Sequence, residues 1–426
     1  MMIQVLYNLV DTFFIGKLGD PNQLAAANIT TPIFMMMMAI ASIVGTGASS
    51  YISRCLGEKD YEKANKILST GIAICIGLGV IITIVGSVFI SPIVQSLGAS
   101  ESTFPFAFDY SIVLFLGAIF IMCNFAIGQL LRSEGAAMGA MLGMLIGTVA
   151  NIVLDPIFIF GFGMGIKGAA IATVLGNAMG LSYYIFYFAS GKSLVKFKTK
   201  SISYDKEILK QIFIIGTPAT ISQLLMGVAM VICNNLAVHY GDIIVAGMGI
   251  SAKIMTIGTF VFMGFSAGCQ PLVGYNFGAK NYHRMRQVII KGMFITSGIG
   301  IILTVIFGIF ARELIGVFTP LTDVISGGTI ILRAMMWSLP FVGPQMLAAT
   351  TVQAMGKAGA SLFLSIARQG VFYIPILFVL ESLFKFSGLI YAQPVSDALT
   401  LGLAIVVLAA IIKKSRKQEE IEMVSD

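Results

Sequence analysis

Long apolar runs, separated by short polar stretches, follow one another from one end of the chain to the other. Most runs are about twenty residues long, which is what an α-helix needs to cross a hydrocarbon core about 30 Å thick. We therefore predict an all-α polytopic membrane protein with twelve transmembrane helices. The predicted segments lie near residues 1–16, 28–52, 70–92, 106–131, 137–160, 168–189, 209–238, 245–270, 289–311, 326–352, 359–380 and 387–412.

The first predicted segment is shorter than the others. It opens at Met1 directly into apolar sequence and ends near Gly16, so that it spans only about 24 Å at 1.5 Å per residue. We therefore expect this start to be truncated or misassigned.

Glycines recur at one fixed distance and indicate a duplication. Gly47, Gly57, Gly71 and Gly135 are each followed 221 residues later by another glycine, and residues 57–61 align with residues 278–282 at the same offset. A period this long exceeds that of a solenoid repeat, so each copy is predicted to be half of the protein. Because six helices separate the copies, both halves enter the membrane the same way up. Their pseudo-twofold axis is then expected to run along the membrane normal.

This duplication predicts a domain organisation in four parts. They are an N-terminal six-helix bundle (1–190), a cytoplasmic linker (191–208), a C-terminal six-helix bundle (209–412) and a charged cytoplasmic tail (413–426). The linker is rich in lysine, but we interpret it as a plain solvated connection and not as a surface for anionic headgroups.

Composition and charge support this class of protein. Hydrophobic residues make up 57% of the chain and charged residues 11%, with a mean hydropathy of +0.92. Twenty lysines and arginines lie in one set of alternating loops and the tail, and only four in the opposite set. Since cationic loops stay in the cytoplasm, both termini are expected there, in a bacterial or archaeal plasma membrane. The loops account for the net charge of +7, so no nucleic-acid partner is expected.

Cysteines and histidines give no sign of a cofactor. The five cysteines are scattered and odd in number, which implies neither a disulfide framework nor a metal-binding spacing. His239 and His283 lie far apart in the sequence. We expect no cofactor other than a coupling ion.

The first helix carries a polar stripe. Gln4, Asn8 and Asp11 recur at four and three residues and so share one helix face. Asp11 is ionisable, and a charge in hydrocarbon normally faces a cavity or a partner. The stripe therefore predicts a functional site. The candidates for lining a substrate cavity are Gln4, Tyr7 and Asn8 and, in the second half, Lys253 and Arg333.

The fifth predicted helix carries a second polar group. Asn151 and Asp155 are four residues apart, and Pro156 cannot donate to the carbonyl of Ile152. Together with Thr173 on the sixth helix, these oxygens suit a proton or a small hard cation such as Na⁺. The alternative is structural, because amides also join helices and Asp155 with Pro156 also fits a capped kink.

These residues resemble those of the multidrug and toxic compound extrusion (MATE) family of transporters. The resemblance rests on residues 6–16, 151–156 and 270–279 and extends over essentially the whole chain. It implies a monomeric, cation-coupled exporter of organic cations that is not an enzyme. The family's polar network in the N-terminal bundle would correspond to Asp11, Asn151, Asp155 and Thr173.

The sequence departs from some branches of the family in its second half. Residues 218–231 in the seventh helix contain no acid, and the tenth helix carries Arg333. At an offset of 222 residues, Asp11 corresponds to Cys233, so we interpret the acid as kept in one copy only. A sodium site in the C-terminal half is not expected.

The mechanism that we expect is exchange by rocker-type alternating access. Because burial disfavours a charged carboxyl, Asp11 and Asp155 would hold a proton when open to the outside and release it toward the cytoplasm. The anionic form then attracts a cationic substrate, so that H⁺ or Na⁺ and substrate compete for one charge state.

Three cations in the second half leave other interpretations open. Lys253, Arg333 and Arg368 would suit an anionic ligand, as in a flippase of the same superfamily for a lipid-linked oligosaccharide. They also fit cations that hold helix ends, and Arg368, interpreted as lying near the cytoplasmic end of the eleventh helix, fits that role best. A membrane-embedded enzyme or a channel is a further alternative, but neither explains the duplication. The natural substrate, the coupling ion and the resting conformation stay open.

Overall fold

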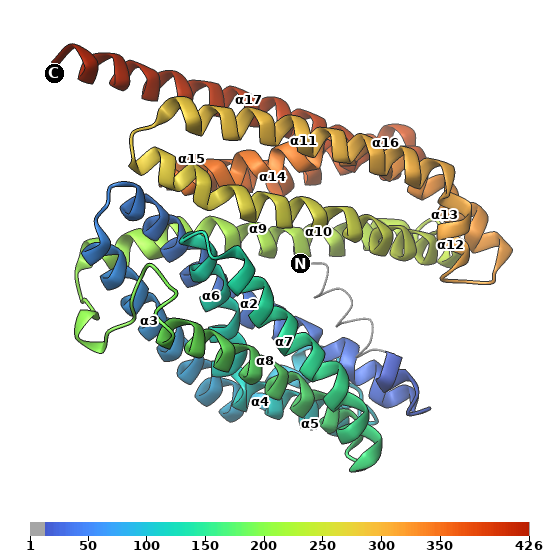
Figure 1. Cartoon of the computed structure of the whole chain (residues 1–426). Coiled ribbons are helices and arrows are strands. Elements are labelled where there is room, and N and C mark those ends of the chain that lie inside the picture. The colour runs from blue at the N-terminus through green and yellow to red at the C-terminus, as the bar shows by residue number, and fades with distance from the viewer. Residues whose placement is uncertain (1–12, 426) are drawn as a thin grey trace. The chain divides into compact units, whose positions relative to one another are not determined.

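The computed structural model describes residues 13–425 and divides the chain into two compact units between Gly216 and Thr217 (Figure 1). We call them the N-terminal and the C-terminal unit. Most of the first predicted helix, with Gln4, Tyr7, Asn8 and Asp11, lies outside the described residues.

The N-terminal unit consists of helices. They are α2 (Pro21–Gly57), α3 (Tyr61–Val88), α4 (Ile90–Ser96), α5 (Phe104–Leu116), α6 (Ala118–Ser133), α7 (Ala137–Pro156), the π-helix η1 (Ile157–Gly161), α8 (Gly165–Ala189), the short η2 (Thr199–Ser201) and the first turns of α9 (Lys206–Val238).

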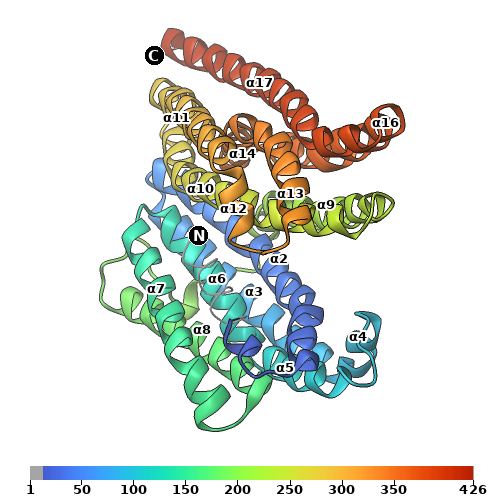
Figure 2. The ribbon, with the colours of Figure 1, turned by 90° about the vertical axis from the view of Figure 1, so that its right-hand side faces the viewer.

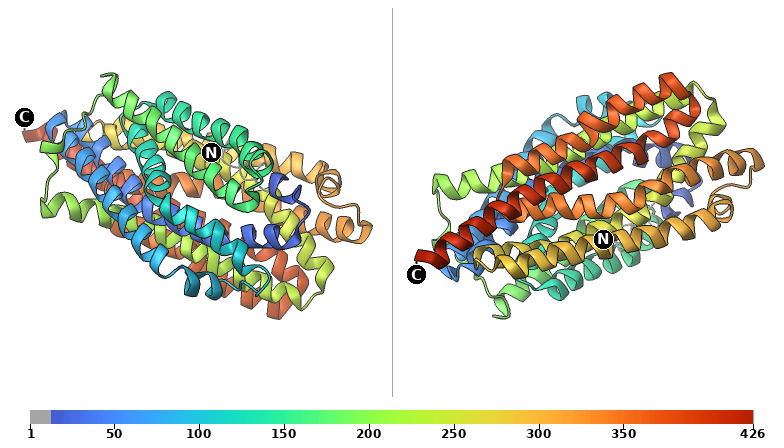
Figure 3. Two further views of the ribbon diagram at one scale, coloured as in Figure 1. Left: turned by 90° about the horizontal axis from the view of Figure 1, so that it is seen from below. Right: turned by 90° about the horizontal axis from the view of Figure 1, so that it is seen from above.

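The C-terminal unit is built in the same way. After α9 it contains α10 (Asp242–Gly278), α11 (Tyr282–Ile309), α12 (Ala311–Gly316), α13 (Thr322–Met335), η3 (Met336–Ser338), α14 (Leu339–Ala354), α15 (Ala358–Ile366), the π-helix η4 (Ala367–Tyr373), α16 (Ile374–Phe384) and α17 (Phe386–Ser425). Helix α17 packs along α16 and continues beyond it (Figure 3).

The predicted all-α membrane fold is confirmed. Among residues 13–425, ten helices are long and apolar enough to cross a membrane. The bent pair α5 and α6 adds an eleventh span, with an angle of 55° at Gly117. With the first predicted segment, most of which lies outside the described residues, this agrees with a twelve-helix layout.

Several helices extend beyond their apolar runs. Helix α2 begins at Pro21, where the Asp20 side chain caps it by accepting a hydrogen bond from the Asn22 amide at 2.9 Å. Asp60 caps α3 in the same way, accepting from the Lys63 amide at 2.9 Å. Because these caps lie outside the apolar core, hydropathy alone places the helix ends several residues too far inward.

The structure confirms the duplication at the level of backbone geometry. The first residues of α3 and α11, Tyr61 and Tyr282, are 221 positions apart, and the same offset separates the starts of α6 and α14, of α7 and α15, and of α8 and α17. Before α3 and α11, Lys59 and Lys280 both adopt left-handed backbone conformations, with φ of 61° and 54°. Each copy therefore repeats the same helices and turns.

The linker does not behave as a plain solvated connection, and that interpretation is wrong. Glu134 Oε2 accepts hydrogen bonds from the Ser193 hydroxyl at 2.7 Å and from the amides of Leu194 and Val195 at 2.8 and 3.1 Å. The Lys196 amide donates to Asn65 Oδ1 at 2.6 Å. Val195 itself is buried in the apolar core. The linker is therefore bound to the N-terminal unit.

Helix α9 begins in the N-terminal unit and continues into the C-terminal one. A Cβ on Gly216 would collide with the carbonyl of Ile43, and a Cβ on Gly47 would collide with that of Ile212. These contacts fix the first turns of α9 against α2. The boundary between the two units lies immediately after Gly216 and just before Pro218. Pro218 cannot donate to the carbonyl of Ile214.

Candidate functional site

Helices α7 and α8 approach each other closely through glycine (Figure 2). A Cβ on Gly176 would lie 2.6 Å from the carbonyl oxygen of Gly147 and 2.9 Å from Cβ of Asn151. Small residues of this kind let two backbones come together in a membrane. The contact brings α8 directly against the polar face of α7.

That polar face carries Asn151 and Asp155. Their side chains are 2% and 0% exposed, and Asn151 Nδ2 donates to Asp155 Oδ1 at 3.3 Å. The spacing of four residues explains the contact, since such residues are neighbours on a helix surface. Asn151 Oδ1 is also buried and has no hydrogen-bond partner among residues 13–425. The pair therefore retains acceptor capacity inside a membrane-spanning helix.

The backbone changes immediately after the acid. Pro156 ends the α-helical hydrogen-bond pattern, and residues 157–161 form the π-helix η1, in which the Phe162 amide donates to the carbonyl of Ile157 at 2.9 Å. Short π-helical segments occur frequently at functional sites. Asp155 thus lies at a local break in a helix.

Helix α8 contributes Thr173 to this polar region, and the side chain is 1% exposed. Asn177 donates to the Thr173 carbonyl at 2.8 Å, and Asn124 of α6 donates to Asn177 Oδ1 at 3.0 Å. Neither Asn124 nor Asn177 was among the residues predicted from the sequence. The spacing of Thr173 and Asn177, four apart in an apolar helix, was the available signal.

The remaining predicted site residues are placed as follows. Gln4, Tyr7, Asn8 and Asp11 lie outside the described residues, so their roles stay predictions. Lys253 is exposed. Arg333 is exposed as well, and its Nε donates to the Gly308 carbonyl at 3.3 Å.

The donor set favours a proton or a hard cation over a transition metal. Over residues 13–425, no group of three or more His, Cys, Asp or Glu side chains is placed to hold a metal ion. Asp155, Asn151 and Thr173 offer carboxylate, amide and hydroxyl oxygens, the ligand types that suit hard cations.

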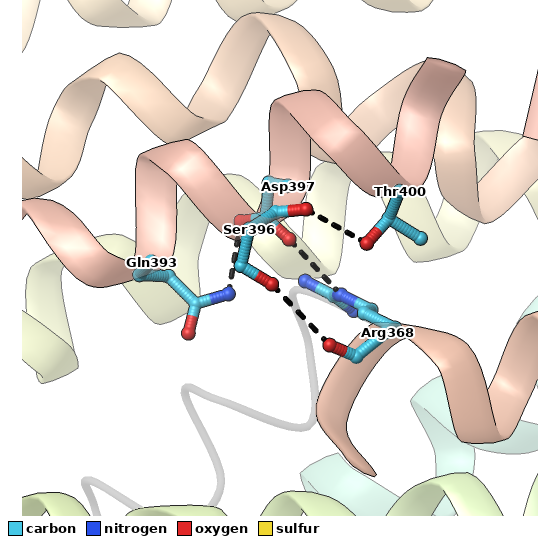
Figure 4. A network of polar contacts seen from close by, with 5 residues as sticks. All are labelled: Arg368, Gln393, Ser396, Asp397 and Thr400. Carbon is cyan, nitrogen blue, oxygen red and sulfur yellow. Dashed lines mark hydrogen bonds and ion pairs between the residues drawn. The ribbon is translucent and has the colours of Figure 1, made fainter. Parts of the chain in front are cut away.

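A second polar network lies in the C-terminal unit (Figure 4). Arg368 of η4 donates through Nε to Asp397 Oδ1 of α17 at 3.2 Å, and Gln393 Nε2 donates to Asp397 Oδ2 at 2.9 Å. The Asp397 side chain is 0% exposed. One interpretation is therefore wrong, because Arg368 is paired with a buried acid instead of holding a helix end. Asp397 was not predicted from the sequence, and it does not occupy the position that corresponds to Asp11, which is Cys233.

Two repeated sets of membrane-spanning helices with buried polar pairs in their interiors define this protein as a polytopic membrane transporter. The MatE family model matches residues 1–157 and 218–379 of the sequence. The chain belongs to the MATE family, and the resemblance expected from the sequence is confirmed.

Similar proteins cover almost the whole chain. Multidrug export protein MepA of Staphylococcus aureus (strain MSSA476) is 35% identical over 400 residues, which are 93% of this chain and 88% of MepA. The protein of the same name from Staphylococcus saprophyticus is 33% identical over 398 residues, again 93% of this chain and 88% of that protein.

Solved structures of the family share the fold. An outward-facing multidrug resistance MATE transporter of the MOP superfamily superimposes with a TM-score of 0.93 at 28% identity, covering 98% of this chain and 94% of that one. A MOP superfamily transporter from Pyrococcus furiosus gives a TM-score of 0.92 at 29% identity, with 98% and 93% covered.

Proposed function

We propose that this protein is a secondary active multidrug exporter that moves organic cations out of the cell in exchange for H⁺ or Na⁺. Membership of the MATE family and similarity to proteins named for multidrug export support this proposal. The observation that carries it is the burial of Asp155, with Asn151 beside it, inside a membrane-spanning helix of the N-terminal unit.

A carboxylic acid in this position acts as a charge switch. In hydrocarbon a lone charge is costly, so the neutral, proton-bound form is favoured until a cation arrives to replace the proton. Asp155 would lose its proton toward the cytoplasm, and the carboxylate formed would attract a cationic substrate. Na⁺ would use the same oxygens of Asp155, Asn151 and Thr173. Asp11 is proposed as the second acid of this site.

Competition for one charge state couples the two fluxes. If substrate and proton each bind only when the other has left, every inward proton allows one outward substrate, provided that the site opens to one side at a time. We assign this alternation to rocker-type alternating access of the two units.

The flippase alternative had its basis in three cations of the C-terminal half. Arg368 is paired with Asp397, so that its positive charge is balanced within the protein. This reduces the case for a net anionic substrate and favours cation export.

Substrate-dependent ion release from purified full-length protein tests the proposal. Ethidium is added to the protein in weakly buffered detergent solution, and released protons are followed with a pH-sensitive dye. Wild-type protein should release protons in proportion to bound ethidium, or Na⁺ if sodium is the coupling ion. Asp155→Asn should bind without release, whereas Asp109→Asn, which removes an exposed acid paired with Lys167, should behave as wild type. Wild-type binding of ethidium without release of either ion would contradict the proposal.

A further inference from the structure

The Arg368 and Asp397 pair takes the place that two glycines occupy in the other copy. Adding the offset of 221 to Gly147 and Gly176 gives positions 368 and 397. In the N-terminal unit these two glycines face each other across α7 and α8, since a Cβ on either one would lie 2.9 or 2.6 Å from the carbonyl oxygen of the other. In the C-terminal unit the equivalent helices are joined there by an ion pair. The duplicated fold thus carries different chemistry at the same point.

The acid of this pair is enclosed and its hydrogen bonds are made. Asp397 accepts from Arg368 at 3.2 Å and from Gln393 at 2.9 Å. Ser396 donates to the Arg368 carbonyl at 3.4 Å and so also fixes the backbone of η4 (Figure 4). Nothing of the Asp397 side chain is exposed.

The arginine, in contrast, keeps donors available. Of its guanidinium nitrogens, only Nε is hydrogen-bonded within the described part of the chain. Its side chain is 22% exposed, against 0% for Asp397. The accessible member of the pair is therefore the guanidinium of Arg368, which is held by the buried carboxylate of Asp397.

The pair lies inside two membrane-spanning segments. Arg368 lies ten residues after Ala358, where α15 begins, and Asp397 lies eleven residues after Phe386, where α17 begins. At 1.5 Å per residue these positions are about 15 and 17 Å along their helices, within segments that are long and apolar enough to cross a membrane. A charged surface at this depth normally faces the interior of the bundle or a water-filled cavity.

We propose that Arg368 binds the carboxylate of zwitterionic substrates, with Asp397 as its positioning residue. The two terminal amino groups of a guanidinium match the two oxygens of a carboxylate. Because Asp397 already neutralises Arg368, a simple anion would leave an excess negative charge in a medium of low dielectric. A zwitterion brings its own cation and keeps the site neutral.

The neighbouring residue adds an acceptor to the same segment. Gln369 follows Arg368 in η4, is 6% exposed, and its Oε1 is buried without a hydrogen-bond partner among residues 13–425. Unpaired buried acceptors are rare in native structures, and an N–H group of a bound ligand would pair this one.

Two matched dyes test the assignment: a cationic rhodamine methyl ester and the same rhodamine as the free acid, a zwitterion. Their Kd values are measured by fluorescence polarisation with purified full-length protein. The variants are Arg368→Lys, the double variant Arg368→Gln with Asp397→Asn, and the control Arg312→Gln, which removes an exposed arginine of α12. The double variant is needed because removing Arg368 alone would leave Asp397 charged, buried and unpaired.

The expected effect is on the preference for the acid, taken as the Kd of the ester divided by the Kd of the acid. This ratio should fall at least tenfold in the double variant. It should fall less in Arg368→Lys, which keeps the positive charge but loses the two amino groups that match a carboxylate. It should not change in Arg312→Gln. Equal ratios in wild type and the double variant would overturn the assignment. If the double variant does not fold, an unchanged ratio in Arg368→Lys overturns it.

The inference rests on the proposed function only in one respect, namely that the bound zwitterion is exported. Uptake of the ester into everted membrane vesicles separates the two. If wild-type vesicles take up no ester although the purified protein prefers the acid through Arg368, the export proposal fails and the assignment of Arg368 stands.

Discussion

Asn151 donates its side-chain amide to the carboxylate of Asp155 across one turn of α7, at 3.3 Å, and both side chains are buried. The contact fixes the orientation of an ionisable group inside a membrane-spanning helix. This hydrogen bond has two effects, because it pairs the buried amide and also holds the buried acid in place.

Replacing Asp155 by Asn should abolish ion-coupled export while the protein still folds. Asn has nearly the same shape, and it is neutral at every pH, so the charge switch is lost without a cavity. We expect at least a tenfold loss of ethidium export by cells, measured against equal amounts of protein in the membrane. Asp109→Asn is the matched control. Full export by Asp155→Asn would exclude Asp155 as the coupling acid.

Gly176→Ala should destabilise the N-terminal unit. The new Cβ would lie 2.6 Å from the carbonyl oxygen of Gly147, which forces α7 and α8 apart. Overpacking of this kind costs about 1–3 kcal/mol. Denaturation of purified protein measures the loss. Gly77→Ala is the control, since nothing lies within 4 Å of its Cβ position; an equal effect in both variants would show that the close contact is not responsible.

The sequence was sufficient for the helical segments, the duplication and the pairing of Asn151 with Asp155, because these depend on local periodicity. It was not sufficient for Asp397. Asp397 lies in α17, and its partner Arg368 lies 29 residues earlier in the sequence, in η4. Only the packing of η4 against α17 brings the two side chains together. The linker was misjudged for the same reason. Its lysines look solvated in sequence, whereas its backbone is bound by Glu134, Asn65 and Ser69.

Glu134 should hold the linker in place, and Glu134→Ala should release it. The substitution removes one acceptor shared by three donors, at a cost of about 1–3 kcal/mol. Glu134→Gln keeps an acceptor oxygen and should cost less. Protease cleavage within residues 191–205 measures release of the linker, and equal cleavage of wild type and Glu134→Ala would contradict this role.

The acidity of Glu134 should also make stability depend on pH. Burial raises the pKa of the Glu134 carboxyl, and hydrogen bonds from Ser193, Val195 and Leu194 oppose this effect only in part. Because the folded protein then holds the proton more strongly than the unfolded chain, this contribution is fully present below the unfolded pKa. It is lost as the pH rises through the folded pKa. Thermal unfolding of wild type and Glu134→Gln is measured between about pH 4 and 7. The stability of wild type relative to Glu134→Gln should fall as the pH rises, and parallel curves would contradict this prediction.

Tyr240 should stabilise the turn between α9 and α10 through its contact with α16. Its hydroxyl donates to Glu381 Oε1 at 2.6 Å, and this hydrogen bond raises the pKa of Tyr240 to about 12. Since the folded pKa exceeds the unfolded one of about 10, the stabilisation is present below pH 10 and is lost as the pH rises toward 12. Tyr240→Phe should lower the unfolding free energy by less than about 1 kcal/mol. If the stability advantage of wild type over Tyr240→Phe grew above pH 10, this role of Tyr240 would be contradicted.

Ethidium uptake into everted membrane vesicles tests the central claim most directly. A pH gradient is imposed first and a sodium gradient second, in vesicles with wild-type protein or Asp155→Asn. Wild-type vesicles should accumulate ethidium under one of the two gradients, and the Asp155→Asn vesicles under neither. Accumulation that ignores both gradients, or that persists in Asp155→Asn, would contradict coupling through the buried acid.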